Sequence, residues 1–492
     1  MTCRYGYQLF AWALVVGVCW AHSDGGEPEA IERFLSLTRG AAEFERDGSL
    51  PGMPVVGVSL RSTIGHMFSD EDLLSLKEIA NLRSIDVSYS SIHSEGLNGL
   101  SEFKNLRTLC LQHSRIKKPK GLGQLTFLTC LNICGTRIKD AGLEHVGRLT
   151  NLRELNLRHT GISDTGLKAL KEMKSLESLN LSQNDISSDG LKELKGLQGL
   201  ARLGLVGMRI RERGLENLSG FKNLTELDLS ETSISDADVR DLRGLENLVS
   251  LNLYATQISD LGVSELSKLR KLRTLILDFT GITDAGLKVL KELKHLTVLS
   301  LSYTRISDGS LQELSDLAEL TTLRLSSTYI TDAGIKEIKT LRHLRNLNLD
   351  ETTITDSGLP NLQQLATLES VDLSFTEITG TGLKEWRSLK NLRTLRLLDT
   401  NITDDGMNAL GGLTQLTTLE IRSPHVTDAG VEALRNLNNL TALSLHCKKV
   451  TNASLKVLIG LKRLTSANVN GSGITRAGAK ELDAWNRSRA ID

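Results

Sequence analysis

Leucine recurs along most of the chain in the pattern L-x-x-L-x-L, and this pattern returns at a fixed spacing. In one copy the leucines are Leu152, Leu155 and Leu157, and the same phase returns 24 residues later at Leu176. Side chains alternate between the two faces of a β-strand. We therefore expect one short strand per copy, with Leu155 and Leu157 pointing inward and Glu154 pointing to the opposite face.

The copies form one long array. Their first leucines are Leu82, Leu106, Leu128, Leu152, Leu176, Leu200, Leu224, Leu248, Leu272, Leu296, Leu320, Leu344, Leu368, Leu392, Leu416, Leu440 and Leu464, which makes 17 copies. One step, between Leu106 and Leu128, is 22 residues long. A degenerate copy with Val55, Val58 and Leu60 as its strand is expected to precede them. We assign residues 55–482 to the array, because stacked copies that share one core are not independent domains.

The second half of each copy predicts a turn and a short helix. In the copy that starts at Leu152, the hydroxyl of Thr160 can satisfy backbone groups of the turning chain. Asp164 is expected to cap the helix, and Leu167 and Leu170 give it an apolar stripe. A column of aspartates could also suggest calcium, but one carboxylate per copy, each at a helix start, favours capping. Gly166 then lies in a first turn that a larger side chain would crowd.

The strand motif followed by T-x-I-T-D-x-G-L, as in residues 280–287, resembles the leucine-rich repeat family. It is most similar to the ITDxGL type, with 24-residue repeats, of secreted bacterial leucine-rich repeat proteins, and it also resembles F-box-linked repeats. The resemblance implies an α/β fold, a horseshoe-shaped solenoid with a parallel β-sheet on the concave side and short helices on the convex side. It implies protein binding in general and names no partner.

The N-terminus has the features of a signal peptide. Arg4 precedes an apolar run over residues 9–18, and Cys19-Trp20-Ala21 approximates a cleavage site. The run is shorter than the roughly 17 to 25 residues of a membrane-spanning helix, so we expect no stable membrane insertion. We predict a signal peptide at 1–21, a capping segment at 22–54 and a C-terminal tail at 483–492. The expected location is secreted or periplasmic.

Composition excludes some partners. The 59 basic and 59 acidic residues give a net charge of +0, so no net field attracts phosphate backbones, and we predict that nucleic acid is not a partner. Residues 30–37 and then 42–46 are expected to be helical within the N-terminal cap, before an Asp47-Gly48 turn. A last short helix is expected to run from after Ile474 through Leu482, with Trp485 over the final core layer.

Candidate chemistry is sparse. Cys110, Cys130 and Cys134 fall on concave strand positions of two adjacent copies. Strand geometry places Cys110 roughly 8 Å from each of the other two, beyond the ~7 Å limit for an unstrained disulfide. We therefore predict neither a metal site nor a cofactor. Cys110 and His113 could act as nucleophile and base, but no acid orients them. The sequence has no glycine-rich phosphate loop or GxSxG motif, and we predict that the chain is not an enzyme.

Binding is expected on the concave strands, because scarce aromatic residues gather there. The candidate partner-binding residues are Tyr254, Phe279, Tyr303, Tyr329, Asp278, Arg324, Asp350 and Phe375. The first four come from four consecutive copies and could form one exposed stripe, and aromatic clusters in a polar rim are common interface anchors. The alternative is that the aromatic residues pack along the sheet edge and that the charged ones are merely solvated.

The sequence favours a non-catalytic extracytoplasmic scaffold that binds a protein or peptide on its concave face. Two other hypotheses remain open. One is an F-box-type substrate adaptor of a ubiquitin ligase, and the other is a structural envelope protein that associates with itself. An enzyme would require an enclosed pocket with perturbed titratable groups.

Overall fold

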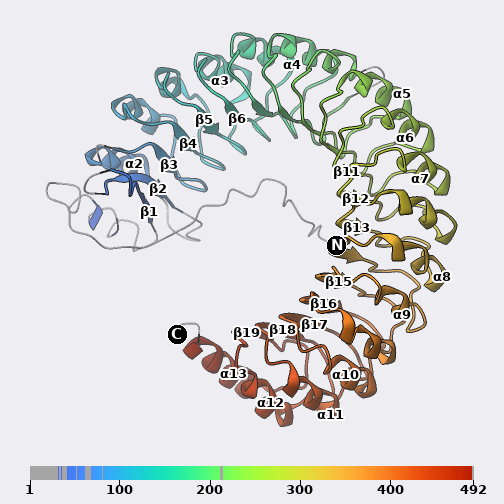
Figure 1. Cartoon of the computed structure of the whole chain (residues 1–492). Helices are drawn as coiled ribbons and strands as arrows, with labels where there is room; N and C mark the ends of the chain where they lie inside the picture. Colours follow the sequence, from blue (N-terminus) through green and yellow to red (C-terminus); the bar gives the residue numbers. More distant parts are fainter. Residues whose placement is uncertain are drawn as a thin grey trace. The chain divides into compact units, whose positions relative to one another are not determined.

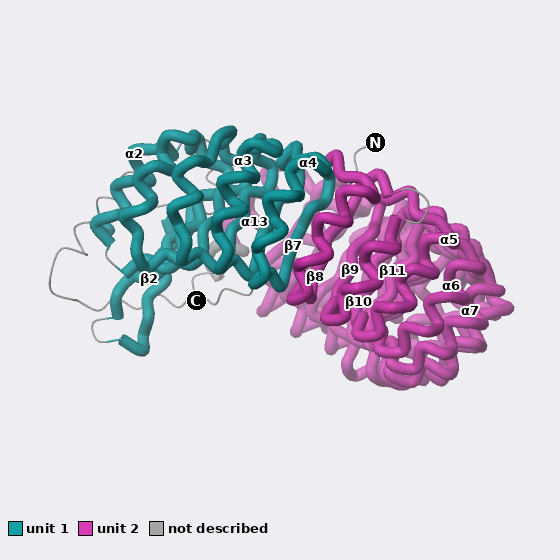
Figure 2. The backbone as a smooth tube through the Cα atoms, turned by 90° about the horizontal axis from the view of Figure 1, so that it is seen from above, with its two compact units in different colours: residues 1–184 teal, residues 185–492 magenta. Residues whose placement is uncertain are grey.

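The computed structural model describes residues 31–32, 35, 42–50, 53–60, 68–79, 81–210 and 214–489. The predicted signal peptide lies outside these residues. The chain divides into two compact units, unit 1 over residues 1–184 and unit 2 over residues 185–492 (Figure 2). Within the described residues, no helix is both long enough and apolar enough to span a membrane.

Unit 1 contains a β-sheet with short helices. Its strands are β1 (Glu43–Arg46), β2 (Val55–Ser59), β3 (Ser84–Asp86), β4 (Thr108–Cys110), β5 (Cys130–Asn132), β6 (Glu154–Asn156) and β7 (Ser178–Asn180). Its helices are α2 (Asp70–Ser75), η1 (Leu76–Glu78), η2 (Gly96–Glu102), η3 (Lys120–Gln124), α3 (Lys139–Val146), α4 (Asp164–Leu167) and η4 (Lys168–Leu170), where η denotes a 3₁₀-helix. Strand β1 pairs antiparallel with β2, and from β2 onward each strand pairs parallel with the next.

Unit 2 continues the same design. Its strands are β8 (Arg202–Gly204), β9 (Glu226–Asp228), β10 (Ser250–Asn252), β11 (Thr274–Ile276), β12 (Val298–Ser300), β13 (Thr322–Arg324), β14 (Asn346–Asn348), β15 (Ser370–Asp372), β16 (Thr394–Leu397), β17 (Thr418–Ile421), β18 (Ala442–Leu445) and β19 (Ser466–Asn468). Its helices are η5 (Gly190–Gly196), η6 (Glu216–Leu218), α5 (Asp236–Val239), η7 (Arg240–Gly244), α6 (Asp260–Leu266), α7 (Asp284–Leu290), η8 (Asp308–Asp316), α8 (Asp332–Ile335), η9 (Glu337–Thr340), α9 (Leu359–Leu362), η10 (Thr381–Ser388), α10 (Asp404–Leu410), α11 (Asp428–Val431), η11 (Glu432–Asn436), η12 (Asn452–Ser454), α12 (Leu455–Gly460) and α13 (Arg476–Arg489).

Neighbouring strands of unit 2 are parallel and in register at the repeat spacing, so that Ser250 lies beside Thr274 and Leu251 beside Leu275. In each unit the strands lie on the inner side of the curve and the helices on the outer side (Figure 1). Each unit is therefore a leucine-rich repeat solenoid with a parallel concave sheet and short convex helices, as the sequence predicts.

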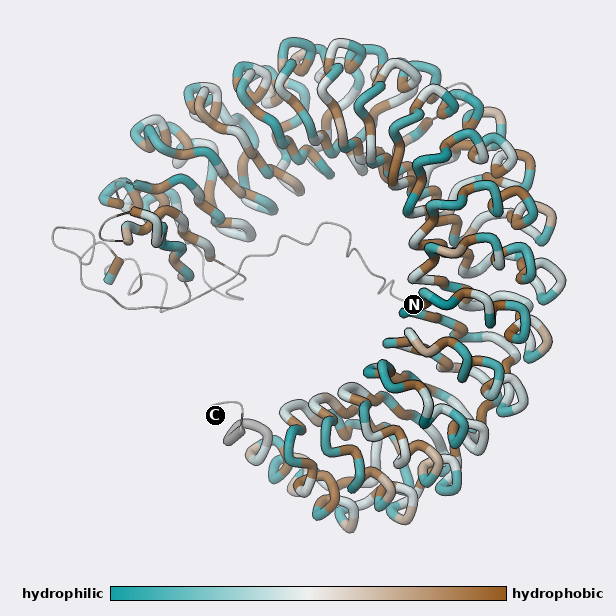
Figure 3. Tube along the Cα trace, viewed as in Figure 1, coloured by the Kyte–Doolittle hydropathy of each residue, from teal (hydrophilic) through white to brown (hydrophobic). Residues whose placement is uncertain are grey.

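The core follows the leucine pattern. Leu155, Leu157, Leu167 and Leu170 are buried, whereas Glu154 between the buried strand positions is partly exposed. Hydrophobic and hydrophilic stretches alternate along every coil of the chain (Figure 3). This alternation confirms the predicted strand faces, because a shift of one residue would turn the leucines to solvent.

The prediction that the hydroxyl of Thr160 satisfies a backbone group of the turning chain is confirmed, and it holds for the threonines at the same position of other repeats, which we call the threonine ladder. Ten threonines, each three residues after the last strand leucine or isoleucine, donate their hydroxyl to the carbonyl of that residue at 2.5 to 3.1 Å. These ten threonines are Thr136, Thr160, Thr232, Thr256, Thr280, Thr304, Thr328, Thr352, Thr376 and Thr400. Each hydroxyl thus supplies a hydrogen bond to a carbonyl at the point where the chain turns away from the strand.

The prediction that Asp164 caps its own helix is wrong. The N-cap is the preceding residue, Ser163, whose hydroxyl accepts from the N–H of Thr165, and Asp164 lies in the first turn. The aspartates of this column instead join adjacent repeats. Asp140 accepts the backbone N–H of Ser163 at 2.7 Å and its hydroxyl at 2.6 Å. The extended N-cap residue has a backbone N–H that its helix does not use, and the carboxylate of the preceding repeat satisfies it.

The same two donors bind an aspartate along most of unit 2. The pairs are Asp236 with Ser259, Asp260 with Thr283, Asp284 with Ser307, Asp308 with Thr331, Asp332 with Thr355, Asp356 with Thr379, Asp404 with Thr427 and Asp428 with Thr451. We call this set the aspartate ladder. It ties the convex turn of each repeat to the next by charge-assisted hydrogen bonds.

Both ends of the array carry additional elements. In unit 1 the described residues Ile31, Glu32 and Leu35 are helical. The expectation of a helix over residues 42–46 is wrong, because Glu43–Arg46 forms β1 and pairs with β2. A turn at Asp47 follows β1. In unit 2 helix α13 runs to Arg489, past the Leu482 that the sequence suggested. Leu482 is buried and Trp485 is half-buried. The boundaries at residues 54 and 482 remain predictions.

Candidate functional site

In each of twelve repeats, the residue two positions after the last strand leucine or valine adopts a left-handed backbone with φ between 50 and 62°. These residues are Tyr89, His113, His159, Gln183, Glu231, Ala255, Phe279, Tyr303, Ser327, Glu351, Phe375 and Asp399. We call them the left-handed column. The conformation lets the backbone N–H continue the hydrogen bonding between repeats, as when Phe279 donates to Ser302 at 2.9 Å and Tyr303 donates to Ser326 at 2.8 Å.

Glycine, asparagine and aspartate are the residues that adopt this backbone most readily. Asp399 is in the column, and Gly135 and Gly207 have a left-handed backbone at the same position of two further repeats. Phe279 and Tyr303 occupy it in two adjacent repeats, where their bulky side chains bring no backbone advantage. The column accepts many residue types in this chain, among them His159, Gln183 and Ala255, so the turn does not require an aromatic side chain at these two positions.

Phe279 and Tyr303 form an exposed aromatic stack. Their ring centroids are 4.0 Å apart with an interplanar angle of 12°, and Tyr254 meets Phe279 edge-on at 5.4 Å. Phe279 is 47% exposed and Tyr303 is 37% exposed, and Tyr254 is half-buried. We call these three residues the aromatic cluster. They come from the ends of β10, β11 and β12, on the concave side of unit 2.

The two other predicted aromatic residues lie apart from this cluster. Tyr329 is 67% exposed and lies four residues after Leu325, where it forms an isolated β-bridge with Ser307. Phe375 is in the left-handed column, but Ser327 and Glu351 separate it from Tyr303. The aromatic residues thus do not form one stripe, because they occupy three different positions within the repeat.

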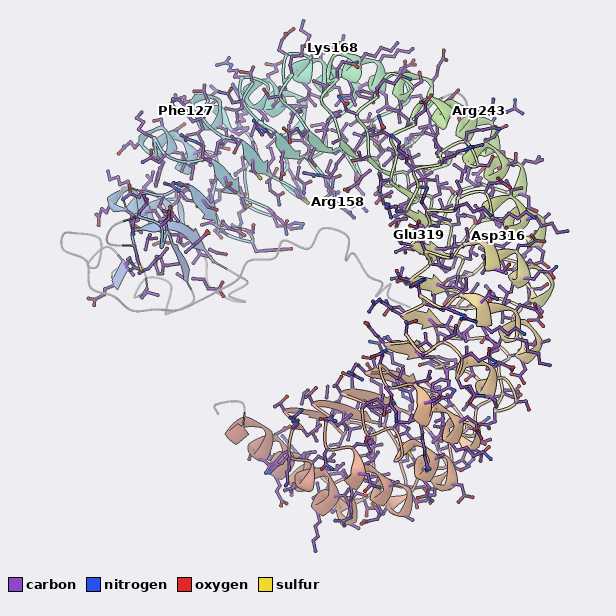
Figure 4. The ribbon with its side chains drawn as sticks, in the orientation of Figure 1. Phe127, Arg158, Lys168, Arg243, Asp316 and Glu319 are labelled. Atoms are coloured by element: carbon purple, nitrogen blue, oxygen red, sulfur yellow. The ribbon has the colours of Figure 1, made fainter. Side chains whose placement is uncertain are left out.

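The sheet surface beside the cluster carries little charge. The partly exposed or small residues on β10 to β13 that face the concave side are Ser250, Asn252, Thr274, Ile276, Val298, Ser300 and Thr322. Arg324 ends this neutral stretch and is exposed. In unit 1, Arg158, which follows the last strand leucine, lies on the inner side of the curve, whereas Lys168 lies on the outer side (Figure 4).

Asp278 is the carboxylate nearest the cluster in sequence. It is half-buried and accepts the backbone N–H of Ser302 at 2.8 Å. Burial raises its pKa, and the hydrogen bond from Ser302 and the charge of Arg324 offset this effect only in part. Among the charged candidate residues, Arg324 is therefore close enough to Asp278 for its positive charge to lower the pKa of that carboxyl group.

Asp350, Glu351 and Asp372 form an acidic cluster on the other side of Tyr303. Burial, followed by the charges of Asp372 and Glu351, raises the pKa of Asp350 to about 7. The Oδ1 atom of Asp350 is buried and has no hydrogen-bond partner within the described residues. Glu351 accepts hydrogen bonds from the Tyr303 hydroxyl at 3.3 Å and from Ser327, and so joins the acidic cluster to the aromatic cluster.

Sequence reasoning identified Asp350 but did not include Glu351. The signal was present, because Glu351 occupies the same repeat position as Phe279 and Tyr303. A comparison of that position across all repeats would have included it.

The cysteine and histidine candidates of unit 1 do not resemble a catalytic pair. Cys110, Cys130 and Cys134 are free thiols. Burial and the charge of Asp86 raise the pKa of Cys110, whereas a nucleophilic thiol needs a lowered pKa. His113 stacks on Tyr89 with centroids 4.9 Å apart. In the part of the chain that the structure describes, no group of three or more His, Cys, Asp or Glu residues could hold a metal ion.

The fold and the repeated motifs define a repeat protein with an open concave sheet. A model of the leucine-rich repeat region matches residues 59–213 and 205–462, and the chain therefore belongs to the leucine-rich repeat family. No relative among proteins of described function matches the sequence.

Three solved structures show similar folds. A leucine-rich repeat protein of Leptospira interrogans is 23% identical with a TM-score of 0.55, and the match covers 84% of this chain and 96% of that one. The functional domain of InlJ from Listeria monocytogenes, which includes a cysteine ladder, is 21% identical with a TM-score of 0.50, covering 76% of this chain and 75% of that one. TLR13 in a complex with ssRNA13 is 20% identical with a TM-score of 0.52, covering 80% and 68%.

Proposed function

We propose that this chain is a non-catalytic extracytoplasmic scaffold that binds a polypeptide partner on the concave sheet of unit 2, through the aromatic cluster Tyr254, Phe279 and Tyr303. The observation that carries the proposal is the exposed stack of Phe279 on Tyr303 at two left-handed positions. The left-handed backbone does not require an aromatic residue, and the two rings are exposed, so they are better suited to a surface role than to a folding role.

Exposed aromatic rings are suited to anchoring a protein partner. They bury a large apolar area on binding and lose little side-chain entropy, and truncation of such an anchor commonly costs more than about 2 kcal/mol of binding free energy. The neutral residues of β10 to β13 would lie under the bound segment, and the charged groups Arg324 and Asp350 would form its rim. A polar rim around an apolar centre is typical of protein interfaces.

A polypeptide fits the concave surface better than a nucleic acid does. TLR13 has a similar fold and its structure contains single-stranded RNA. Here the net charge is +0, and carboxylates rather than a stripe of cations lie beside the aromatic cluster. The extracytoplasmic location rests on the basic and apolar residues 4–18 and is tested separately by the N-terminal sequence of the mature protein.

Differential capture tests the proposal. Extracellular and envelope fractions of the native source are passed over the wild-type protein and over the double variant Phe279→Asn/Tyr303→Asn, and bound proteins are quantified by mass spectrometry. Asparagine suits the left-handed backbone, so the fold is expected to persist. We expect at least one protein that the wild type enriches to fall about tenfold or more with the variant, in line with the loss of an anchor pair.

The matched control is Leu261→Asn in the first turn of α6, an exposed apolar residue on the convex side that is 74% exposed. Capture is expected to survive this change. Equal capture by the wild type and by the aromatic double variant would overturn the proposal, and loss of capture only in the Leu261 variant would place binding on the convex side.

A further inference from the structure

Basic residues are concentrated in one part of unit 1. Residues 103–139 contain eight basic residues and no acidic residue, in a chain whose 59 basic and 59 acidic residues balance overall. Six of the eight are exposed and lie after β4, up to the first residue of η3, or after β5, up to the first residue of α3. We call these six residues the basic cluster, and they are Arg115, Lys117, Lys118, Lys120, Arg137 and Lys139.

The two turns that carry the basic cluster lie side by side. The backbone N–H of Arg137 donates to the carbonyl of Ile116 at 3.2 Å, so Arg115 and Arg137 occupy the same position in adjacent repeats. Paired backbones of this kind are about 4.8 Å apart, and like charges at such a distance repel each other. None of the six side chains forms an ion pair within the described residues. The fold therefore gains no electrostatic stabilisation from this arrangement.

The basic cluster lies in a gap in the column of aspartates that joins adjacent repeats. Asp70 and Asp140 each accept a backbone N–H of the following repeat, at 2.8 and 2.7 Å. The two repeats between them carry Ser94 and Lys118 at the same position. Two negative charges of the column are therefore absent here, and a positive charge replaces one of them.

The backbone of these turns does not depend on the basic side chains. The hydroxyl of Ser94 accepts the backbone N–H of Lys117 at 3.2 Å and that of Lys118 at 2.9 Å. Lys139 donates its backbone N–H to the carbonyl of Thr160 at 3.1 Å. Neutral groups thus satisfy the donors that an aspartate satisfies in other repeats. The exposed ammonium groups are therefore better suited to a surface role than to a folding role.

Carboxylates follow the basic cluster along the chain and precede it. Glu95 lies one residue after Ser94, Glu144 lies in α3, and both are exposed. A long polyanion with a charge on every unit, such as a nucleic acid, would meet these carboxylates where it leaves the cluster. A polypeptide can place acidic residues against the cations and neutral residues against Glu95 and Glu144. The charge pattern therefore favours a short acidic segment of a polypeptide.

We propose that the basic cluster of unit 1 binds an acidic polypeptide segment, whose carboxylates pair with Arg115, Arg137 and the lysines on either side of Pro119. The planar guanidinium groups suit carboxylates because they donate two parallel hydrogen bonds. This surface is separate from the aromatic cluster of unit 2, and the inference goes beyond the proposed function and does not depend on it.

Binding of a defined probe tests this inference. The probe is an acetylated hexa-glutamate peptide with a fluorescent label, and its affinity for the full chain is measured by fluorescence anisotropy at pH 7 and moderate salt. We expect Lys117→Glu/Lys118→Glu to weaken binding about tenfold or more, because two attractions become repulsions. Lys117→Gln/Lys118→Gln, which only removes the two charges, is expected to weaken binding by a smaller factor and serves as the test if the reversed variant does not fold.

The matched control is Lys168→Glu/Lys171→Glu. Both lysines are exposed in unit 1, and Lys168 lies on the outer side of the curve (Figure 4). This variant changes the net charge of the chain by the same amount as Lys117→Glu/Lys118→Glu. We expect it to change the affinity for hexa-glutamate by less than about twofold, because salt screens charges that are far from the bound peptide.

Three outcomes would overturn the inference. The first is no measurable binding of hexa-glutamate to the wild type, and the second is an equal loss of affinity in the two charge-reversed variants, which would mean that net charge alone governs binding. The third is tighter binding of a hexathymidylate oligonucleotide or of phosphatidylglycerol vesicles than of the peptide, with the same dependence on Lys117 and Lys118. The cluster would then bind a nucleic acid or a membrane surface. Circular dichroism of each variant establishes that the fold is retained.

Discussion

Gly286 lies directly against the carboxylate of Asp260 in the preceding repeat. A Cβ atom on Gly286 would be 2.5 Å from the Oδ1 atom of Asp260, the same oxygen that accepts the N–H of Thr283 at 2.8 Å. The glycine of one repeat thus makes room for the aspartate of the repeat before it. The sequence pattern predicts crowding at this position, and the structure identifies the group that would be crowded.

Replacement of Gly286 tests that relationship. Gly286→Ala is expected to lower the free energy of unfolding by about 1 to 3 kcal/mol, because the methyl group displaces the Asp260 carboxylate from Thr283. The matched control is Gly309→Ala in η8, where the nearest atom to an added Cβ is 3.8 Å away. Urea unfolding of both variants is the measurement. Equal stability of the two would contradict the role given to Gly286.

The aspartate ladder makes the chain sensitive to acid. Burial alone would disfavour the charged forms of Asp284 and Asp428, but hydrogen bonds from serine and threonine side chains and from backbone N–H groups lower both pKa values below 3.8. A group with a lowered folded-state pKa stabilises the fold above its unfolded-state pKa, and this contribution is lost as the pH falls through the folded-state value.

We therefore expect unfolding free energy to fall below pH 4, and less steeply in Asp284→Asn. Asparagine keeps an acceptor for Ser307 but does not titrate. The measurement is urea unfolding from pH 6 to pH 2.5. Parallel profiles for the wild type and the variant would show that Asp284 does not contribute to acid sensitivity.

The contribution of Asp350 to the free energy of unfolding depends on pH in the opposite direction. Its pKa is raised to about 7 in the folded chain, so the folded state binds the proton more tightly than the unfolded state does. Its ionisation therefore reduces stability as the pH rises from about 4 to 7. Asp350→Asn is expected to raise the unfolding free energy at pH 8 by about 1 to 2 kcal/mol, after allowance for solvent screening of a half-exposed group.

The same variant is expected to have little effect at pH 4, where Asp350 is protonated in the folded chain. Unfolding curves of the wild type and the variant at the two pH values measure the difference. A variant less stable than the wild type at pH 8 would contradict this expectation, because it would mean that the Asp350 carboxylate has a stabilising hydrogen-bond donor or cation in the folded chain.

The left-handed backbone at Phe279 predicts which substitutions the fold accepts. Phe279→Asn is expected to change the unfolding free energy by less than about 1 kcal/mol, because relief of the backbone offsets the lost ring contact. Phe279→Val is expected to be less stable than Phe279→Asn by about 1 kcal/mol or more, since a β-branched residue is strongly disfavoured there. Equal stability of the two variants would argue against a backbone constraint at this position.

The sequence predicted most of the fold, because the repeat is local and is copied many times. The alternation of Glu154 and Leu155 is sufficient to orient a strand, and the position of Thr160 is sufficient to place its hydroxyl near the turn. Asp164 was misassigned because Ser163 and Asp164 are both good N-cap residues, and the pattern within one repeat does not reveal a bond to a neighbouring repeat.

The candidate site was predictable only in part. Tyr254, Phe279 and Tyr303 were found as scarce aromatic residues on adjacent repeats, but Tyr329 follows its strand by two residues more than Tyr303 does and lies elsewhere. The raised pKa of Asp350 could not be foreseen, because it depends on burial and on the carboxylate of Asp372 on the neighbouring strand as well as on the adjacent Glu351. Such effects arise from three-dimensional packing rather than from composition.

Site-specific photo-crosslinking tests the central claim most directly. A benzophenone amino acid replaces Tyr303 on the concave side in one variant and Leu261 on the convex side in another, and each is irradiated with the native fraction from which the wild type captures its partner. If the concave aromatic cluster binds that partner, the variant at position 303 will crosslink to it and the variant at position 261 will not. A crosslink from position 261 without one from position 303 would contradict the account.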